Sequence, residues 1–328
     1  MAILLSDLKC YGVATEADDD TVEQIGGAIA TSIKKHFSDY AGNVQVVSSS
    51  ASDTTQTMTL TYRDAAGSKL TEVKTITGQS PAALSATIER MLKGLKSASC
   101  AGDVALEASV AERTGTCQAS GNGNIAIALD AGASAVNDAY AGMIARTTAG
   151  TGNGQIKEVI AYDGVTKVCL VNAPWAINPD GTTEYRLSKG MFFDKGPSEI
   201  LQVRRIFYDA GSNPAGGADK KYYDAICWKN THATLAGTLA SLGEWADPSG
   251  LVAYAVAAAI NDTGTNGSGN NRLVAPAGLT FNSDAKNVPG GQLAPADYIK
   301  VWLELTLDDG AAALKTTYGP QLQVNTVA

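Results

Sequence analysis

The chain has 328 residues, of which 18% are charged and 6% aromatic, and its formal net charge is −8. Its Lys and Arg residues are not clustered, which argues against nucleic acid and anionic membranes as partners, because both attract a basic face. The 34 glycines and the tracts of small residues are typical of short strands joined by tight turns.

The cysteines indicate the compartment in which the chain folds. They are odd in number and never spaced as CxxC, and they are Cys10, Cys100, Cys117, Cys169 and Cys227. This spacing argues against a zinc site and against a disulfide framework. It predicts buried thiols in a protein made in a reducing cytoplasm. The longest apolar run, residues 251–260, is about half of a membrane span, so we expect a soluble protein.

The first predicted element is a helix over residues 21–37. Thr21 is a suitable N-cap, and Lys34 and Lys35 fall in the last turn, where the helix dipole favours them. Apolar residues recur at helical spacing, namely Val22, Ile25, Ile29 and Ile33. The adjacent Gly26 and Gly27 oppose this prediction, since each costs roughly 1 kcal/mol relative to alanine.

The period then changes to two, as a half-buried strand requires. Met58, Leu60 and Tyr62 alternate with threonines, and RDAAGS at residues 63–68 predicts the turn of a hairpin. Residues 80–95 fit a helix that begins at Ser80, but they also fit a strand in their second half.

From about residue 102 onward, short runs bounded by Gly, Asn, Asp or Pro predict strands of a barrel or sandwich. The predicted fold is mainly β, with multi-domain β-sandwich or β-barrel modules and a small α+β N-terminal section. Shifts in composition divide the chain into an N-terminal arm (1–20), an α+β/β-sandwich domain (21–111), an inserted β module (112–190) and a C-terminal β-sandwich domain with a C-terminal arm (191–328).

Three glycines at alternate positions, Gly150, Gly152 and Gly154, suggest at first a phosphate-binding loop. A dinucleotide loop requires GxGxxG between a strand and a helix, so that the helix N-terminus meets the phosphates. Here the spacing is GxGxG, and the following residues alternate as a strand before the hairpin signal Asp163-Gly164. The sequence therefore predicts a turn, and no cofactor.

Two segments that contain aspartates resemble cation sites. EADDD at residues 16–20 is better explained as a solvated turn before the predicted helix. DTGTNG at residues 262–267 opens like a calcium loop. However, its third position is Gly264, and Leu273 stands where the bidentate Glu belongs. We therefore expect no metal site.

Catalytic residues are equally scarce. His36 and His232 lack cysteine or carboxylate partners at ligand spacing, which favours surface or capping roles. No serine lies in a GxSxG elbow. An aromatic set could line a sugar cleft, but core packing is the better interpretation; it comprises Trp228, Trp245, Trp302, Tyr222 and Tyr223.

Two stretches resemble virion proteins of tailed bacteriophages. Residues 57–94 resemble a strand, Asp-Ala-Ala-Gly turn and strand segment that is common in phage head and tail proteins. Residues 150–187 are similar to a recurrent phage module with a Gly-rich turn before Gln, a Tyr-Asp-Gly hairpin and a Pro-Trp. This chain departs from that pattern at Ile156-Lys157, where an Arg often follows the Gln. Residues 228–250 and 260–288 also resemble virion proteins.

The resemblance implies a non-enzymatic capsid decoration or cement protein on the exterior of the head, made in the bacterial host cytoplasm. Its partners would be the major coat protein and copies of itself, as a trimer. The chain ends are the expected interaction arms, because extended segments add strands to neighbours; frayed termini are the other interpretation. The arm residues are Met1, Ile3, Leu4, Leu5, Tyr318, Leu322 and Val324.

Two alternatives stay open. A tail-tube, neck or baseplate protein would use the same β modules. A glycan-binding or glycan-cleaving particle protein would need paired carboxylates in a cleft. Glu184, Glu199 and Glu244 are available for that role, but nothing in the sequence brings them together.

Overall fold

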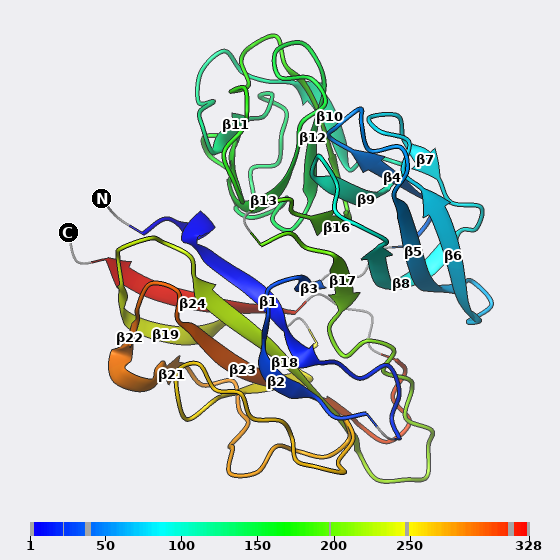
Figure 1. Cartoon of the computed structure of the whole chain (residues 1–328), viewed down its shortest axis with the longest axis vertical. Helices are drawn as coiled ribbons and strands as arrows, with labels where there is room; N and C mark the ends of the chain where they lie inside the picture. Colours follow the sequence, from blue (N-terminus) through cyan, green and yellow to red (C-terminus); the bar gives the residue numbers. More distant parts are fainter. Residues whose placement is uncertain are drawn as a thin grey trace. The chain divides into compact units, whose positions relative to one another are not determined.

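The computed structural model describes residues 3–21, 23–36, 41–196, 198–246, 249–313 and 318–326. These residues form β strands together with two short 3-10 helices, Leu5–Asp7 (η1) and Pro289–Gly291 (η2) (Figure 1). The predicted mainly β fold is therefore confirmed. Within the described ranges, no helix has the length and apolar character needed to cross a membrane.

The chain divides into two compact units (Figure 1). Unit 1 consists of Met1–Asp39 and Arg204–Ala328, and unit 2 consists of Tyr40–Val203. Unit 2 is thus an insertion in unit 1, and both ends of the chain belong to unit 1.

Unit 1 is a sandwich of two antiparallel sheets. One sheet has the strand order β2-β1-β18-β23-β20, and in the other β19 pairs with β21, β22 and β24. Residues of both sheets share one core, which includes Ile226, Leu303 and Leu242. The strands of these two sheets are β1 (Leu8–Thr15), β2 (Gly26–Ala30), β18 (Lys220–Asn230), β19 (Gly237–Ala246), β20 (Val252–Val256), β21 (Lys286–Asn287), β22 (Gln292–Leu293), β23 (Tyr298–Leu307) and β24 (Gly319–Thr326). Unit 1 also contains β3 (Ile33–His36), which belongs to neither sheet.

Strand β23, with the sequence YIKVWLELTL, is buried along nearly its whole length, although Lys300, Glu304 and Thr306 interrupt its apolar residues. Ile299, Val301 and Leu303 face the sandwich core. Trp302 points to the opposite face of the sheet and packs with Cys227 in a second cluster. The first sheet of unit 1 is therefore covered on both faces.

The helix predicted over residues 21–37 is wrong, because the described part of this range contains the strands β2 and β3 and no helix. Val22 lies outside the described residues. Gly26 and Gly27 have φ values of 119° and 83°, which no helix accommodates. Strand β2 pairs with β1, with Val13 opposite Ile29. Pairing with a neighbouring strand therefore outweighs the helical spacing, and the predicted α+β section is β.

Unit 2 contains three groups of paired strands. One has the order β16-β9-β4-β7, another contains β17, β8, β5 and β6 in that order, and the third is a six-stranded sheet, β10-β15-β12-β13-β14-β11. The strands are β4 (Val44–Ser48), β5 (Thr57–Asp64), β6 (Lys69–Thr75), β7 (Ala82–Ala83), β8 (Ile88–Lys96), β9 (Val104–Ala108), β10 (Arg113–Thr116), β11 (Ala126–Ala128), β12 (Ile144–Ala149), β13 (Ile156–Asp163), β14 (Val168–Val171), β15 (Glu184–Ser188), β16 (Gly190–Phe193) and β17 (Gln202–Arg205). Strand β17 begins in unit 2, and its last two residues, Arg204 and Arg205, belong to unit 1.

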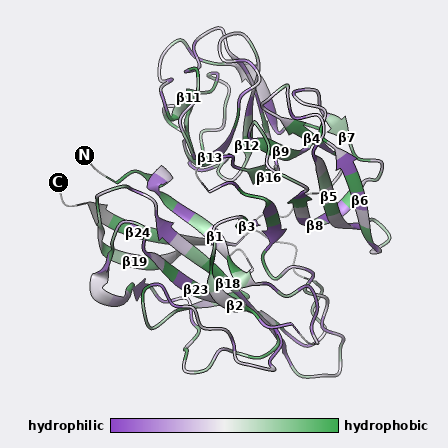
Figure 2. Ribbon diagram, viewed as in Figure 1, coloured by the Kyte–Doolittle hydropathy of each residue, from purple (hydrophilic) through white to green (hydrophobic). Residues whose placement is uncertain are grey.

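The hairpin predicted around RDAAGS is confirmed as β5 and β6, which pair in antiparallel register. Figure 2 shows hydrophobic and hydrophilic residues in turn along β6, an edge strand. For residues 80–95 the strand interpretation is correct and the helix is wrong, because β8 pairs with β5, with Leu60 opposite Gly94. Gly94 leaves room for Phe193, whose Cζ would lie 2.8 Å from an added Cβ.

The six-stranded sheet is built from residues 113–188, all within the module predicted at 112–190. Strands β10 and β11 stand at opposite ends of the strand order. Nevertheless, Gln118 N, just after β10, donates a hydrogen bond of 3.0 Å to Ala128 O of β11. The sheet therefore curls around its own core, to which Ile127, Tyr162 and Trp175 belong.

Candidate functional site

The glycine-rich loop at residues 150–154 is a turn before β13, as predicted, and the Asp163-Gly164 hairpin joins β13 to β14. The protein itself fills the space beside each glycine. An added Cβ would lie 1.9 Å from Thr182 O at Gly150, 2.4 Å from Gln155 Nε2 at Gly152 and 2.2 Å from Gln79 Nε2 at Gly154. The glycines thus allow close packing of neighbouring chain segments.

Gln155, which follows these glycines, ties the turn to the loop at residues 176–177. Its Oε1 accepts hydrogen bonds from Ala176 N (2.7 Å) and Ile177 N (3.0 Å). Its Nε2 donates to Gly152 O (2.9 Å) and to Ile177 O (2.8 Å). This motif of the sequence therefore has a structural role in unit 2.

The strongest candidate for chemistry is a buried charged group in unit 1, which we call the Lys35 cluster: Glu16, Asp18, Lys35, Arg204 and Asp224. Lys35 Nζ donates to Glu16 Oε2 and, over 2.7 Å, to Asp224 Oδ1. The side chains of Lys35, Glu16 and Asp224 are 0%, 7% and 3% exposed. An amine and two carboxylates are thus held together away from water.

Arg204 is the second cation of the Lys35 cluster. Its Nη1 lies 2.7 Å from Asp18 Oδ1, and its Nε lies 3.4 Å from Glu16 Oε2. Its Nη2 donates to Ala17 O over 2.5 Å, and the guanidinium lies over the ring of Tyr208, 4.5 Å from the centroid. Arg204 therefore holds the segment that carries both carboxylates.

Backbone N–H groups fix the carboxylate of Asp224. Its Oδ2 accepts from Phe207 N and its Oδ1 from Ala225 N, both over 2.7 Å. Burial raises the pKa of Glu16 and outweighs the opposing charges of Lys35 and Arg204. A proton is therefore easier to place on Glu16 than on an exposed glutamate.

The prediction of a solvated turn at residues 16–20 is wrong for Glu16 and Ala17, which are buried, whereas Asp18 and Asp20 are half-buried. Glu16 is buried, and Asp20 lies 3.0 Å from Lys220 Nζ and 2.7 Å from Arg272 Nη2. Only Asp19 in this segment is fully on the surface. Lys220 and Arg272 are distant from Asp20 in the sequence, so no local pattern predicts these ion pairs.

The two histidines have different surroundings. His36 lies in β3 and is buried, so the predicted surface position is wrong. His232 lies in a loop, where its Nδ1 accepts from Thr234 N (3.1 Å) and Leu235 N (2.9 Å). The predicted capping role is confirmed for His232.

The segment that mimics a calcium loop is held by a lysine. Lys300 Nζ lies 2.8 Å from Asp262 Oδ2 and donates to Gly264 O over 2.6 Å. In the part of the chain that the structure describes, no group of three or more His, Cys, Asp or Glu side chains could hold a metal ion.

The aromatic residues considered for a sugar cleft lie mainly in the core. Tyr222, Tyr223 and Trp302 are buried, as predicted. Trp228 is half-buried against the sandwich core. The side chain of Trp245 lies outside the described residues.

The candidate glutamates do not form a described pair. Glu199 Oε1 accepts from Lys96 Nζ (2.5 Å) and from Cys100 N (2.9 Å). Glu184 is exposed on β15. The side chain of Glu244 lies outside the described residues.

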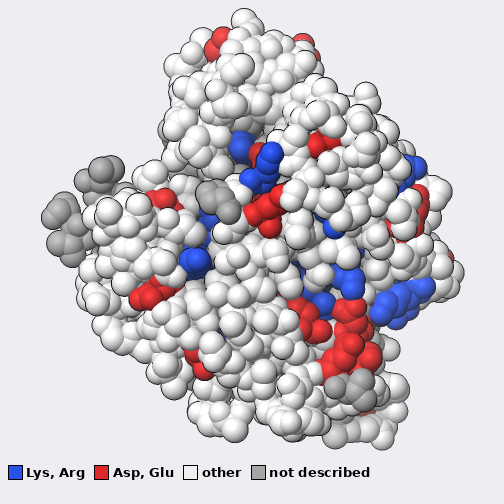
Figure 3. Space-filling view, viewed as in Figure 1, with Lys and Arg blue, Asp and Glu red and all other residues white. Residues whose placement is uncertain are grey.

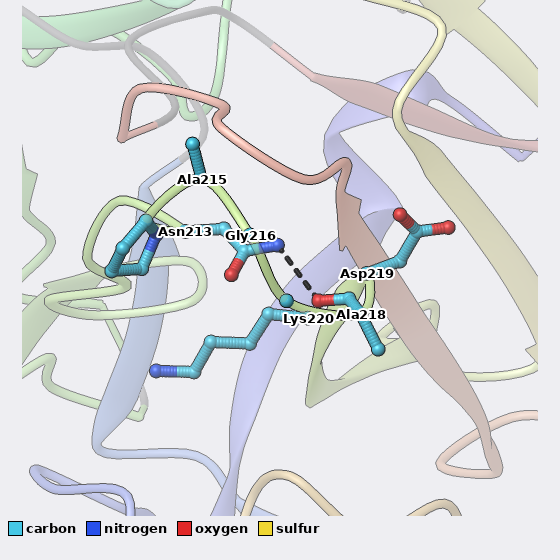
Figure 4. A pocket seen from close by; sticks show the side chains of 8 residues that line it. Asn213, Ala215, Gly216, Ala218, Asp219 and Lys220 are labelled. Carbon is cyan, nitrogen blue, oxygen red and sulfur yellow. Dashed lines mark hydrogen bonds between the residues drawn. The ribbon is translucent and has the colours of Figure 1, made fainter.

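A shallow depression of about 470 Å³ is lined by residues 213–220 (Figure 4). The amide of Asn213 is committed to the main chain, because its Nδ2 donates to Ala218 O, Leu307 O and Asp308 O over 3.0–3.1 Å. The depression therefore reflects a loop organised around Asn213.

All five cysteines are free, and four of them are buried, with Cys10 half-buried. The prediction of buried thiols is confirmed for these four. Burial raises the pKa of Cys100 to about 11 and the pKa values of Cys117 and Cys227 to about 12. These thiols are therefore poor nucleophiles at neutral pH.

Surface charges of both signs adjoin one another on the face shown in Figure 3.

The predicted arm residues fall into two groups. At the N-terminal end, Leu4 and Leu5 are 48% and 53% exposed, whereas Ile3 is half-buried and Met1 lies outside the described residues.

The C-terminal arm residues pack within their own unit. Tyr318 and Leu322 are buried in the sandwich core, and Val324 is half-buried against it. The strand that carries Leu322 and Val324, β24, pairs with β19.

The chain was compared with protein-family models, with curated proteins and with solved structures, and none of them matches it.

Proposed function

We propose that this chain is a non-enzymatic structural protein of a tailed-phage particle, and specifically a capsid decoration or cement protein on the exterior of the head. Its partners are the major coat protein and further copies of itself, arranged as a trimer. It is made in the host cytoplasm and needs no cofactor. A shell under internal pressure gains from many modest contacts that repeat with its symmetry.

The observation that carries the proposal is the exposed leucine pair at the start of the chain. Leu4 precedes η1 and Leu5 is its first residue, just before β1, and the two leucines are 48% and 53% exposed. The segment is short, so its apolar surface suits one small contact that is repeated across a shell. The resemblance of residues 57–94 and 150–187 to virion proteins supports the same assignment.

The first test is the native mass of the purified protein, measured by light scattering after gel filtration. We expect a trimer near three times 33.8 kDa. Rings of six or more subunits would instead favour a tail-tube protein and would overturn the cement assignment.

The second test is co-sedimentation with empty heads of the phage whose genome encodes the chain. The wild-type protein should sediment with the heads, and the double variant Leu4→Asp with Leu5→Asp should stay in the supernatant. Val165→Asp is the matched control, because Val165 is 85% exposed on the β13–β14 turn. A wild-type protein that does not bind heads would refute the proposal.

A further inference from the structure

The Lys35 cluster brings together the groups needed to form an amide bond. Lys35 Nζ lies 2.7 Å from Asp224 Oδ1, and Glu16 Oε2 accepts a hydrogen bond from the same nitrogen. Lys35 is completely shielded from solvent, and Asp224 is 3% exposed. Exclusion of water removes the competing hydration of the amine and the carboxyl.

We propose that Lys35 and Asp224 condense to form an internal isopeptide bond, with Glu16 as the proton carrier. This inference concerns a modification of the chain itself and does not depend on the proposed virion function.

The reaction needs no external reagent. Lys35 transfers one ammonium proton through the Glu16 carboxylate to Asp224, which leaves a neutral amine and a neutral carboxylic acid. Nζ then attacks Cγ of Asp224 and forms the C–N bond. A second proton from the nitrogen, again carried by Glu16, reaches the departing hydroxyl, the C–O bond breaks, and one water molecule leaves. Ammonium and carboxylate thus become an amide and water.

The surroundings match each step of this reaction. Phe207 N and Ala225 N each donate to Asp224 over 2.7 Å and would stabilise negative charge on its oxygens during the attack. Burial raises the pKa of Glu16, so this carboxyl can hold a proton in transit. Arg204, whose Nε lies 3.4 Å from Glu16 Oε2, keeps Glu16 beside the amine and also binds Asp18.

A second buried lysine provides an internal comparison. Lys300 is also 0% exposed and lies 2.8 Å from Asp262, but the side chain of Asp262 is 31% exposed. The other described hydrogen bond of Lys300 goes to the backbone oxygen of Gly264 rather than to a second carboxylate. Among the residues that the structure describes, Lys300 therefore has one carboxylate partner and no second carboxylate to carry protons, and we expect the Lys300–Asp262 pair to remain a salt bridge.

The bond would have a mechanical consequence. It would join β3 to β18 across 189 positions of the sequence and close a ring that contains all of unit 2. A load applied between the two chain ends would then pass through the bond and bypass unit 2.

The experiment is intact mass spectrometry of the denatured, full-length protein. The wild-type mass should be lower than the mass calculated from the sequence by the mass of one water molecule. Any processing of the chain ends changes the mass of the variants as well, so the variants show how large that correction is. Lys35→Arg and Asp224→Ala should each have their full sequence mass. Most or all of the Glu16→Gln protein should also have its full sequence mass, because the bond does not form. Lys300→Arg is the matched control and should still lose one water molecule.

Tryptic mapping of the wild-type protein identifies the bond directly, even where a variant fails to fold. We expect one branched peptide that contains both Lys35 and Asp224. A wild-type protein with its full sequence mass, or a water loss that persists in Lys35→Arg, would overturn the proposal.

Discussion

Glu107 and Arg146 join two sheets of unit 2, because Arg146 Nη2 on β12 lies 3.1 Å from Glu107 Oε1 on β9. The Glu107 side chain is completely buried. It also accepts from Gln45 Nε2 (2.8 Å) and Ser188 Oγ (2.9 Å), and Arg186 Nε lies 3.5 Å away. This carboxylate therefore links the β16-β9-β4-β7 sheet to the six-stranded sheet.

Glu107→Gln should lower the free energy of unfolding by about 3 kcal/mol, because it leaves two guanidinium groups without their buried counter-charge. Urea unfolding measures the change. Glu112→Gln is the control, since Glu112 and Lys189 are 48% and 51% exposed and 3.8 Å apart. Its cost should be at most about 1 kcal/mol. Equal losses in both variants would show that burial of Glu107 is unimportant.

Gly150→Ala should destabilise unit 2 through a collision with the backbone. Gly150 has φ 71°, and the added Cβ would lie 1.9 Å from Thr182 O. Gly67→Ala isolates the conformational part of the cost, because Gly67 has φ 81° and no atom within 4 Å of its added Cβ. We expect thermal unfolding to show a loss at Gly150 that exceeds the loss at Gly67 by about 2 kcal/mol. Similar losses would contradict the close approach of Thr182.

Leu322→Ala tests whether the C-terminal strand belongs to the core of unit 1. Leu322 is 5% exposed in the sandwich core, so the truncation should cost about 2–5 kcal/mol in unfolding free energy. Leu5→Ala, at a position that is 53% exposed, should change stability by no more than about 0.5 kcal/mol. If Leu322→Ala left stability unchanged but abolished assembly, the C-terminal strand would be a free arm.

Acid should weaken unit 1 partly through Asp20. Burial opposes ionisation of Asp20, but hydrogen bonds from Lys220 and Arg272 outweigh it and lower its pKa. The stabilisation is therefore complete above the pKa of an unfolded aspartate, about 3.9, and is lost as the pH falls through the lower folded-state value. Asp20→Asn should make stability fall less steeply between about pH 5 and pH 2, which is roughly the range over which Asp20 titrates. The urea midpoint, measured at several pH values, checks this expectation. An unchanged slope would exclude Asp20 from acid unfolding.

Local patterns predicted much of the β structure. The alternation at Met58, Leu60 and Tyr62 predicts β5, and the turn residues predict the hairpins β5–β6 and β13–β14, because these elements depend on near neighbours. The spacing of Gly150, Gly152 and Gly154 was likewise sufficient to reject a phosphate loop. The helix over residues 21–37 failed because β2 derives its stability from β1, which no local period reveals.

The candidate site could not be derived in the same way. The local pattern predicts a helix-terminal lysine at Lys35 and a solvated acid at Glu16, whereas the fold buries both side chains beside Asp224. The sequence by itself determined the mainly β fold, the turns and the unpaired, mostly buried state of the cysteines, since these follow from residue type and short-range spacing. Only the tertiary structure decided which charges meet, because ion pairs between distant strands depend on how the whole sheet is assembled and on the water that its packing excludes.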